Sequence, residues 1–336
     1  MAKRAGPNKS NLSPSKITDS VFAFREARVI LTAYELDLFT IIGDGYKSSG
    51  EIARHAGTDG RATDRLLNAL CASGYLQKKG GKFSNSPLAA RYLVKGGPDY
   101  LEGLMHQVSL WNTWSTLTDA VRVGSSVLSR GSIDKRDDDW LGSFIAAMHM
   151  RAKRQAPAVV DLIDLRGVRR VLDVGGGSGA FSTAFARANK NINAVVFDLP
   201  YVTPLTRNYI ESEYPGGRIS FVQGDYTTDS LGRGFDLVFM SAVIHSNSAA
   251  TNRQLFGKAF EALNPGGRIV VLDFIMDDDR VSPAAGAYFS LNMLVGTAEG
   301  DTFTESEIRK WMKDSGFIRV RRIGTRFGTD LMIGKK

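Results

Sequence analysis

The chain has 336 residues, of which 43% are hydrophobic and 23% charged, a composition typical of a globular protein of about two domains and not of a disordered chain. The net charge of +8 lies almost wholly in residues 1–97, which hold 15 basic and 8 acidic side chains. Because no stretch approaches the roughly 20 consecutive apolar residues of a membrane-spanning helix, we expect a soluble, cytoplasmic protein without a membrane partner.

Cysteine and histidine usage argues against a metal site. Cys71 is the only cysteine, so neither an internal disulfide nor a thiolate cluster can form. The four histidines, His55, His106, His149 and His245, do not have the spacing of metal ligands. We therefore expect no metal and a reducing compartment.

The N-terminal part predicts a basic tail followed by a winged-helix domain. Residues 1–16 are polar and basic and are expected to form a mobile tail. In residues 17–97, apolar side chains recur at helical spacing from Val21 to Ile42, and Ser48 with Glu51 forms a capping-box pattern. Asp59 caps a second helix, and Gly80-Gly81 separates two short strand-like runs. Helix, helix and hairpin in this order predict a winged helix.

The rest of the chain predicts an α/β domain. Residues 98–158 read as a helical linker and substrate-pocket segment, and residues 159–336 alternate β-branched runs with helices, which is typical of a Rossmann-like parallel sheet. The last two strands have only a short connection, so they are expected to pair antiparallel. The seven predicted strands are Arg170–Val174, Asn193–Phe197, Arg218–Val222, Phe235–Met240, Arg268–Phe274, Phe317–Arg322 and Leu331–Ile333.

A glycine-rich turn and several acids mark the carboxyl ends of the first three strands of this sheet. The first strand runs into the glycines Gly175, Gly177 and Gly179, and Asp198 follows 19 residues after Gly179, where it can accept hydrogen bonds from a ribose diol. After the third strand come Gly224, Asp225 and Tyr226. This pattern predicts a nucleoside-containing cofactor.

The acid that precedes the glycines distinguishes between two candidate cofactors, NAD and S-adenosylmethionine. Gly175-x-Gly177-x-x-Ala180 nearly matches the dinucleotide fingerprint, so the loop alone fits NAD as well. Asp173 stands two residues before the first glycine, where a carboxylate suits an ammonium group better than a pyrophosphate. This favours S-adenosylmethionine, which carries an amino group and a sulfonium and no phosphate.

These motifs resemble those of the small-molecule O-methyltransferases of the caffeic acid, acetylserotonin and hydroxyneurosporene type. The resemblance covers nearly the whole chain from Val21. The motifs that carry it are VLDVGGGSG, FDLP, GDY, FMSAVIHSNS and NPGGRIVVLDF. It implies an N-terminal winged helix that builds a homodimer and a second domain that binds S-adenosylmethionine.

The resemblance implies a general base and a carboxylate partner. His245 aligns with the family's base, and Asp273 stands where the family has Glu on the fifth strand. An imidazole with a pKa near neutrality suits the removal of a hydroxyl proton. The chain departs from the pattern at Ser246, where plant members have Asp, and at Thr302, which replaces a second Glu.

The remaining expected contacts surround these residues. The cofactor contacts are Asp173, Gly175, Gly177, Gly179, Asp198, Leu199, Gly224, Asp225, Tyr226 and Ser241. By similarity and position, the expected contacts of a flat aromatic or polyketide-like substrate are His106, Trp111, Met148, Phe289, Asn292 and Met293.

Other functions fit parts of the pattern. A winged helix with a local charge of +7 could bind duplex DNA while the second domain senses a ligand, but Asp59 and Asp64 beside the recognition helix would repel phosphates. We therefore do not expect a nucleic-acid partner. A C- or N-methyltransferase of the same fold remains an alternative, as does a relative that binds the cofactor without transferring its methyl.

Overall fold

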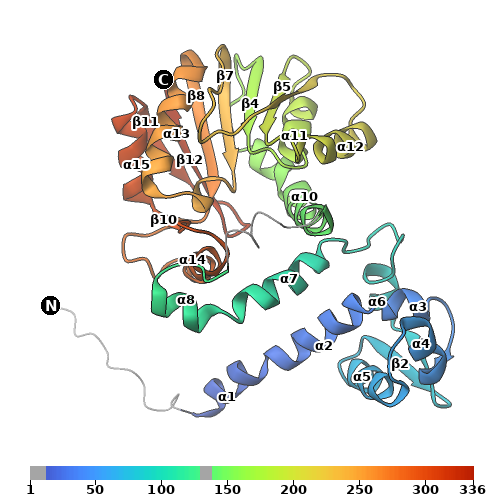
Figure 1. Ribbon diagram of the computed structural model, residues 1–336. Coiled ribbons are helices and arrows are strands. Elements are labelled where there is room, and N and C mark those ends of the chain that lie inside the picture. Colours follow the sequence, from blue (N-terminus) through green and yellow to red (C-terminus); the bar gives the residue numbers. More distant parts are fainter. Residues whose placement is uncertain (1–12, 129–137) are drawn as a thin grey trace. The chain divides into compact units, whose positions relative to one another are not determined.

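The computed structural model describes residues 13–128 and 138–336, so residues 1–12 of the predicted tail lie outside the described part. The chain divides into two compact units, residues 1–108 and 109–336 (Figure 1). The division falls within residues 98–158, the segment expected to link the two halves. In the described residues, no helix combines the length and the apolar character needed to cross a membrane.

The first unit is mostly helical. Its helices, the last of which extends beyond the unit boundary, are α1 (Ser15–Phe22), α2 (Phe24–Glu35), α3 (Leu38–Ile42), α4 (Ser49–Ala56), α5 (Gly60–Ala72), α6 (Pro87–Tyr92) and α7 (Leu104–Trp114). Its strands β1 (Lys47–Ser48), β2 (Leu76–Lys79) and β3 (Lys82–Asn85) form an antiparallel sheet in the order β1-β3-β2.

Local signals in the sequence set the boundaries of these elements. Ser48 and Glu51 form the predicted capping box of α4, and the Asp59 carboxylate accepts the amide N–H of Ala62 at the start of α5. The helical run expected over Val21–Ile42 is broken, because Asp37 adopts a left-handed conformation with φ of 55° between α2 and α3. Aspartate tolerates this conformation better than most residues do, so hydrophobic periodicity alone does not reveal the break.

The second unit contains the α/β fold. Its helices are α8 (Leu117–Val123), α10 (Asp138–Val160), α11 (Ala180–Ala188), α12 (Thr203–Glu213), the 3₁₀ turn η2 (Ile244–Ser246), α13 (Ala249–Ala262), α14 (Ala284–Gly296) and α15 (Glu305–Asp314). Its strands are β4 (Arg170–Val174), β5 (Asn193–Asp198), β6 (Ile219–Gln223), β7 (Phe235–Ser241), β8 (Leu263–Asp273), β9 (Ile275–Met276), β10 (Phe303–Thr304), β11 (Ile318–Ile323) and β12 (Asp330–Lys335).

Seven of these strands form one sheet in the order β11-β12-β8-β7-β4-β5-β6, which confirms the predicted fold class. All seven predicted strands are present, with ends that shift by a few residues. Strands β4 to β8 pair in parallel. Strand β12 pairs antiparallel with β11, as the short connection between them predicts, and also with β8.

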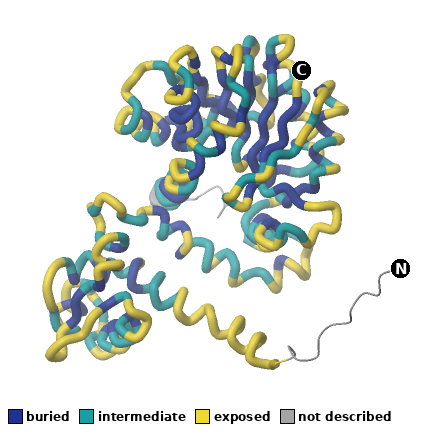
Figure 2. The backbone as a smooth tube through the Cα atoms, turned by 180° about the vertical axis from the view of Figure 1, so that it is seen from behind, coloured by how far each residue is buried: buried dark blue, intermediate teal, exposed yellow. Residues whose placement is uncertain are grey.

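Helices cover both faces of the sheet, which accounts for its nearly continuous apolar strands. Along β4, Leu172 and Val174 join the core formed with α13 and α15, while Val171 joins the core formed with α10 and α11. This alternation follows from the two-residue period of a strand. Figure 2 shows the strands of the sheet as a buried layer between more exposed helices.

The strand order reverses beside β4, and this reversal positions the site. From β4 the chain continues outward through β5 and β6, and then returns to β7 on the other side of β4. Ligands of such sheets bind at the carboxyl ends of the strands where the order reverses. The loops after β4, β5, β6 and β7 meet at that edge.

Candidate active site

The glycine loop after β4 needs its glycines for two reasons. Gly175, Gly177 and Gly179 all have positive φ, which other residues adopt only with strain. A Cβ at Gly179 would also lie 2.5 Å from Cδ1 of Ile210, whereas a Cβ at Gly177 would meet only Cδ1 of Ile145 at 4.0 Å. The loop therefore packs tightly at Gly179 and leaves open space beside Gly177.

Asp173, near the end of β4, is a fully buried carboxyl group. Its Oδ2 accepts a hydrogen bond from the Ser182 hydroxyl at 2.7 Å. Burial, together with the nearby Asp198 carboxyl group, raises the pKa of Asp173 to about 7, while the hydrogen bond from Ser182 opposes this shift. Such a group has a strong electrostatic preference for a cationic neighbour.

Asp198, at the end of β5, closes against the glycine loop. Its Oδ2 accepts the amide N–H of Gly177 at 2.8 Å, and its Oδ1 accepts the amide N–H of Leu199 at 2.8 Å. Burial raises the pKa of Asp198, and the two amide hydrogen bonds oppose that shift. The two amide groups thereby fix the orientation of the carboxylate at the end of β5.

The third predicted acid has a different environment. Asp225, just after β6, accepts the amide N–H and the hydroxyl of Thr227, at 2.8 and 2.6 Å. It therefore shapes its own turn. Gly224 packs on Phe197, since a Cβ there would lie 2.5 Å from Cζ of that ring. The hydroxyl of Tyr226 donates to Oδ1 of Asn247 at 3.1 Å, which links the β6 turn to the segment after β7.

A buried imidazole and carboxylate pair lies after β7. Nδ1 of His245 is 2.7 Å from Oδ1 of Asp273, and the two side chains are 10% and 1% exposed. Because an ionised carboxylate only accepts, Nδ1 carries the proton and Nε2 is left as the acceptor. Oδ2 of Asp273 is buried and has no hydrogen-bond partner among the described residues.

The chain around His245 contacts two other predicted segments. A Cβ at Gly175 would lie 2.9 Å from Cγ2 of Val243, so the glycine loop packs against the turn that carries His245. Ser241 ends β7 just before this turn. On the other side, the amide N–H of Asp301 donates to the carbonyl oxygen of His245 at 2.9 Å.

In the described residues, the Thr302 hydroxyl makes no hydrogen bond to His245, so it does not take over the role of the missing glutamate. Its hydroxyl donates to the carbonyl of Gly286 at 3.4 Å, and its side chain is buried. Ser246, the other departure from the family pattern, is exposed at the end of η2. The carboxylate that contacts the imidazole is that of Asp273.

Aromatic rings extend from His245. Phe289 contacts the imidazole edge-on, with centroids 4.8 Å apart, and stacks on Phe274 at 4.1 Å. On the same helix α14, the Asn292 side chain accepts the indole N–H of Trp114 at 2.9 Å, and Met293 is buried. Of the predicted substrate contacts, Phe289 is thus directly against the imidazole.

The other predicted substrate contacts occupy two helices. Met148 is half-buried on α10. His106 and Trp111 lie on α7, and the boundary between the two compact units falls between them.

Sequence reasoning missed a cluster that braces the glycine loop. The imidazole of His149, on α10, lies 3.0 Å from the hydroxyl of Ser178 and 3.1 Å from Oε1 of Glu213, and it stacks on Tyr209. The sequence around His149 gives no sign of this cluster, because its partners Ser178 and Glu213 lie in distant segments of the chain.

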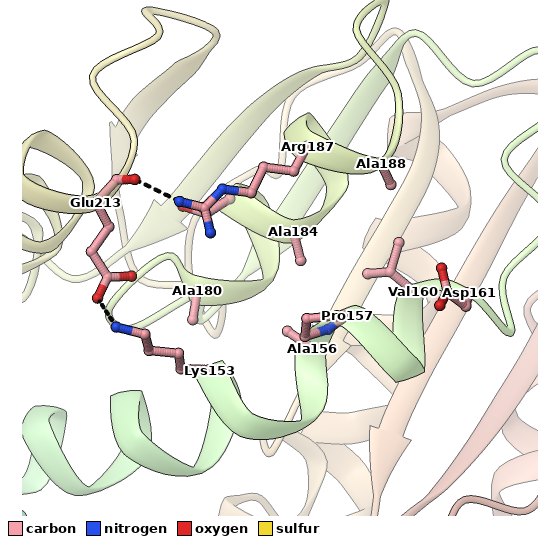
Figure 3. A pocket seen from close by; sticks show the side chains of 11 residues that line it. Lys153, Ala156, Pro157, Val160, Asp161, Ala180, Ala184, Arg187, Ala188 and Glu213 are labelled. Atoms are coloured by element: carbon pink, nitrogen blue, oxygen red, sulfur yellow. Dashed lines mark hydrogen bonds and ion pairs between the residues drawn. The ribbon is translucent and has the colours of Figure 1, made fainter. Parts of the chain in front are cut away.

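A cavity of about 280 Å³ between α10 and α11 is shown in Figure 3, and it lies apart from the predicted catalytic residues. Its floor is formed largely by alanines, Pro157 and Val160. At its rim, Glu213 accepts hydrogen bonds from Lys153 through Oε1 and from Arg187 through its backbone carbonyl, both at 2.6 Å. These contacts stabilise the packing of α10 against α11 and α12.

Comparison with known proteins agrees with this arrangement. Residues 114–318 match the family model of the O-methyltransferase domain, and residues 18–95 match that of the O-methyltransferase dimerisation domain. The chain is 32% identical to 3-hydroxy-5-methyl-1-naphthoate 3-O-methyltransferase of Streptomyces sahachiroi, over 92% of this chain and 91% of that protein.

Two further proteins extend the comparison. The tetracenomycin polyketide synthesis 8-O-methyl transferase TcmO of Streptomyces glaucescens is 31% identical over 98% of this chain and 99% of its own. The solved structure of PigF with SAH superimposes with a TM-score of 0.85 at 26% identity, covering 97% of this chain and all of that one. The resemblance inferred from the motifs is confirmed, and the chain belongs to the O-methyltransferase family that combines these two domains.

Proposed function

We propose that the protein transfers a methyl group from S-adenosylmethionine to a hydroxyl of a small aromatic or polyketide-like molecule, with His245 as general base. The observation that carries the proposal is the buried pair of His245 and Asp273, next to a turn that packs on the glycine loop at Gly175. The pair would provide a proton acceptor beside the predicted cofactor site.

The residues of the glycine loop fit S-adenosylmethionine better than a dinucleotide. Asp173 and Asp198 bring two buried carboxyl groups to the loop, which suits an ammonium group and a ribose diol and opposes a pyrophosphate. The open space beside Gly177 allows a ligand to approach the backbone. The PigF structure, which was solved with SAH, supports the same choice.

The chain's own residues would accept the proton of the acceptor hydroxyl and orient the imidazole that receives it. S-adenosylmethionine, when bound, supplies a methyl group on a positively charged sulfur. Nε2 of His245 accepts the proton of the acceptor hydroxyl, and Asp273 stabilises the resulting imidazolium and fixes the ring. Such a base contributes roughly 10² to 10⁴ in rate, and alignment of the reactants can contribute about 7 to 11 kcal/mol more.

The acceptor class follows from the aromatic surroundings of His245. Phe289 and Phe274 provide stacked rings beside the imidazole, which suit a flat acceptor. The two named Streptomyces relatives act on a naphthoate and in tetracenomycin polyketide synthesis. His106, Trp111, Met148, Asn292 and Met293 remain proposed acceptor contacts.

We also propose that the protein is a homodimer through its N-terminal helices. Ile17, Val21, Phe22 and Phe24 on α1 and α2 are between 49% and 68% exposed, an unusually apolar surface for a monomer. The match of residues 18–95 to the dimerisation domain supports this assignment. Light scattering of the purified protein should give about twice the mass of the 36.6 kDa chain, and the mass of a single chain would contradict the dimer.

An acceptor screen tests the proposed reaction directly. The protein is incubated with methyl-labelled S-adenosylmethionine and a panel of phenolic and polyketide acceptors that each offer a hydroxyl, an amine or an activated carbon. We expect labelled methyl ethers from hydroxyl acceptors. Products labelled only on nitrogen or carbon would replace O-methylation by one of the alternative reactions.

A further inference from the structure

Arg151, on α10 in the second unit, carries a guanidinium that is partly shielded from water. The side chain is half-buried, and burial lowers the pKa of Arg151 while the nearby carboxylate of Asp273 opposes the shift. Among the described residues no hydrogen bond or ion pair engages this guanidinium, although it offers five N–H donors. Its described neighbour is the ring of Phe274, whose centroid lies 5.0 Å from Cζ of Arg151.

Aromatic rings connect Arg151 with the pair of His245 and Asp273. The ring of Phe274 stacks on Phe289 with an interplanar angle of 23°, and Phe289 contacts His245 edge-on. Phe274 also directly follows Asp273 in the chain. A run of aromatic rings therefore has an imidazole at one end and a guanidinium at the other.

The Asp273 carboxylate does not form an ion pair with Arg151. Oδ1 of Asp273 already accepts from His245 and from the amide N–H of Phe274, and no ion pair of 4.0 Å or less joins the carboxylate to Arg151. A partly desolvated cation without a hydrogen-bonded anionic partner costs folding free energy, so binding of a ligand that supplies the anion is favoured. The planar guanidinium fits a carboxylate with two parallel hydrogen bonds.

We propose that Arg151 selects acceptors that carry an acidic group, such as a carboxylate, on the same aromatic framework as the methylated hydroxyl. The acidic group pairs with the guanidinium while the hydroxyl faces His245. This inference rests on the proposed function and narrows the acceptor class to hydroxylated aromatic acids.

A matched pair of ligands tests the selection without relying on turnover. Binding of 3-hydroxy-1-naphthoate and of the corresponding neutral carboxamide is measured by calorimetry on protein saturated with S-adenosylhomocysteine. The wild type should bind the acid roughly 10- to 100-fold more tightly than the amide, which is the range expected for a hydrogen-bonded ion pair. In Arg151→Gln this preference should shrink to within threefold while amide affinity stays the same.

Two variants separate recognition from a structural effect. Arg151→Lys keeps the charge and should retain part of the preference for the acid. Arg154→Gln removes an exposed arginine from the same helix and should behave as the wild type.

Three results would overturn the proposal: equal binding of acid and amide by the wild type, equal weakening of both in Arg151→Gln, or a loss of S-adenosylhomocysteine affinity in that variant. The second would mean that Arg151 acts through the site's structure or through Asp273, and the third that it binds the cofactor. Selective acid binding without methyl transfer would instead contradict the proposed reaction and leave the recognition by Arg151 standing.

Discussion

Nδ1 of His245 lies 2.7 Å from Oδ1 of Asp273, on side chains that β7 and β8 bring together although they are 28 residues apart. Strands β7 and β8 are parallel neighbours, with Ser241 opposite Leu272, so their carboxyl ends necessarily meet. The carboxylate holds the proton on Nδ1 and leaves Nε2, the atom proposed as the base, free to accept. Asp273 is therefore a positioning residue for the proposed reaction.

Replacing Asp273 by Asn tests this relationship. The amide keeps the size of the side chain but loses the charge that stabilises an imidazolium, and its NH₂ group can face Nδ1 and favour the wrong tautomer. We expect turnover to fall by on the order of 10² with little change in the affinity for S-adenosylhomocysteine. Steady-state kinetics and calorimetry give the two values, and an unchanged turnover would show that the pair serves structure alone.

Replacing Asp198 by Asn tests the cofactor contact. The carboxylate accepts two amide hydrogen bonds from the glycine loop and the β5 turn, and a neutral side chain would also bind a ribose diol more weakly. The affinity for S-adenosylhomocysteine should fall at least tenfold, or by about 1.4 kcal/mol. Asp225→Asn provides the comparison, because Asp225 is largely engaged with Thr227 and should affect affinity less.

The raised pKa of Asp173 predicts a pH dependence of stability. Its pKa in the folded protein, about 7, lies above the ordinary 3.8, so the fold favours the protonated group. The resulting stabilisation is complete below about pH 4 and is lost as the pH rises through 7. Asp173→Asn cannot ionise, so its melting temperature minus that of the wild type should increase from pH 5 to pH 8 without cofactor. A constant difference across this range would contradict the assignment.

Two glycines of the same loop should respond differently to alanine. In Gly179→Ala, the left-handed backbone and the close contact with Ile210 add up to a destabilisation of about 2 to 4 kcal/mol. In Gly177→Ala only the backbone strain applies, so about 1 to 2 kcal/mol is expected. Denaturant unfolding gives the free energy of unfolding of each variant. Equal losses of this free energy would mean that the contact of Gly179 with Ile210 on α12 does not add to the cost.

Local sequence patterns were sufficient for most of the fold. The β-branched runs predicted all seven strands of the sheet, and the short link before Leu331 predicted antiparallel pairing. Capping residues such as Ser48 and Asp59 located helix starts because their hydrogen bonds span only three residues. The break at Asp37 was missed, since a single left-handed residue leaves the apolar periodicity intact.

The site was only partly predictable, because some of its contacts depend on how distant helices pack. Asp198 could be predicted because the fold class brings strand ends to one edge of the sheet, whereas Asp273 was predicted from the resemblance to the family. The contacts of His149 with Ser178 and Glu213 depend on how α10 packs, which no local pattern encodes. Arg151 stands in the run MRAKR, where it resembles one more charge on an exposed helix face.

Turnover of His245→Ala, measured together with its affinity for S-adenosylhomocysteine, tests the central claim most directly. We predict a loss of turnover on the order of 10² or more with cofactor affinity within twofold of the wild type, while His55→Ala, which changes an exposed histidine of the first unit, remains fully active. Turnover within threefold of the wild type would contradict the assignment of His245 as the base.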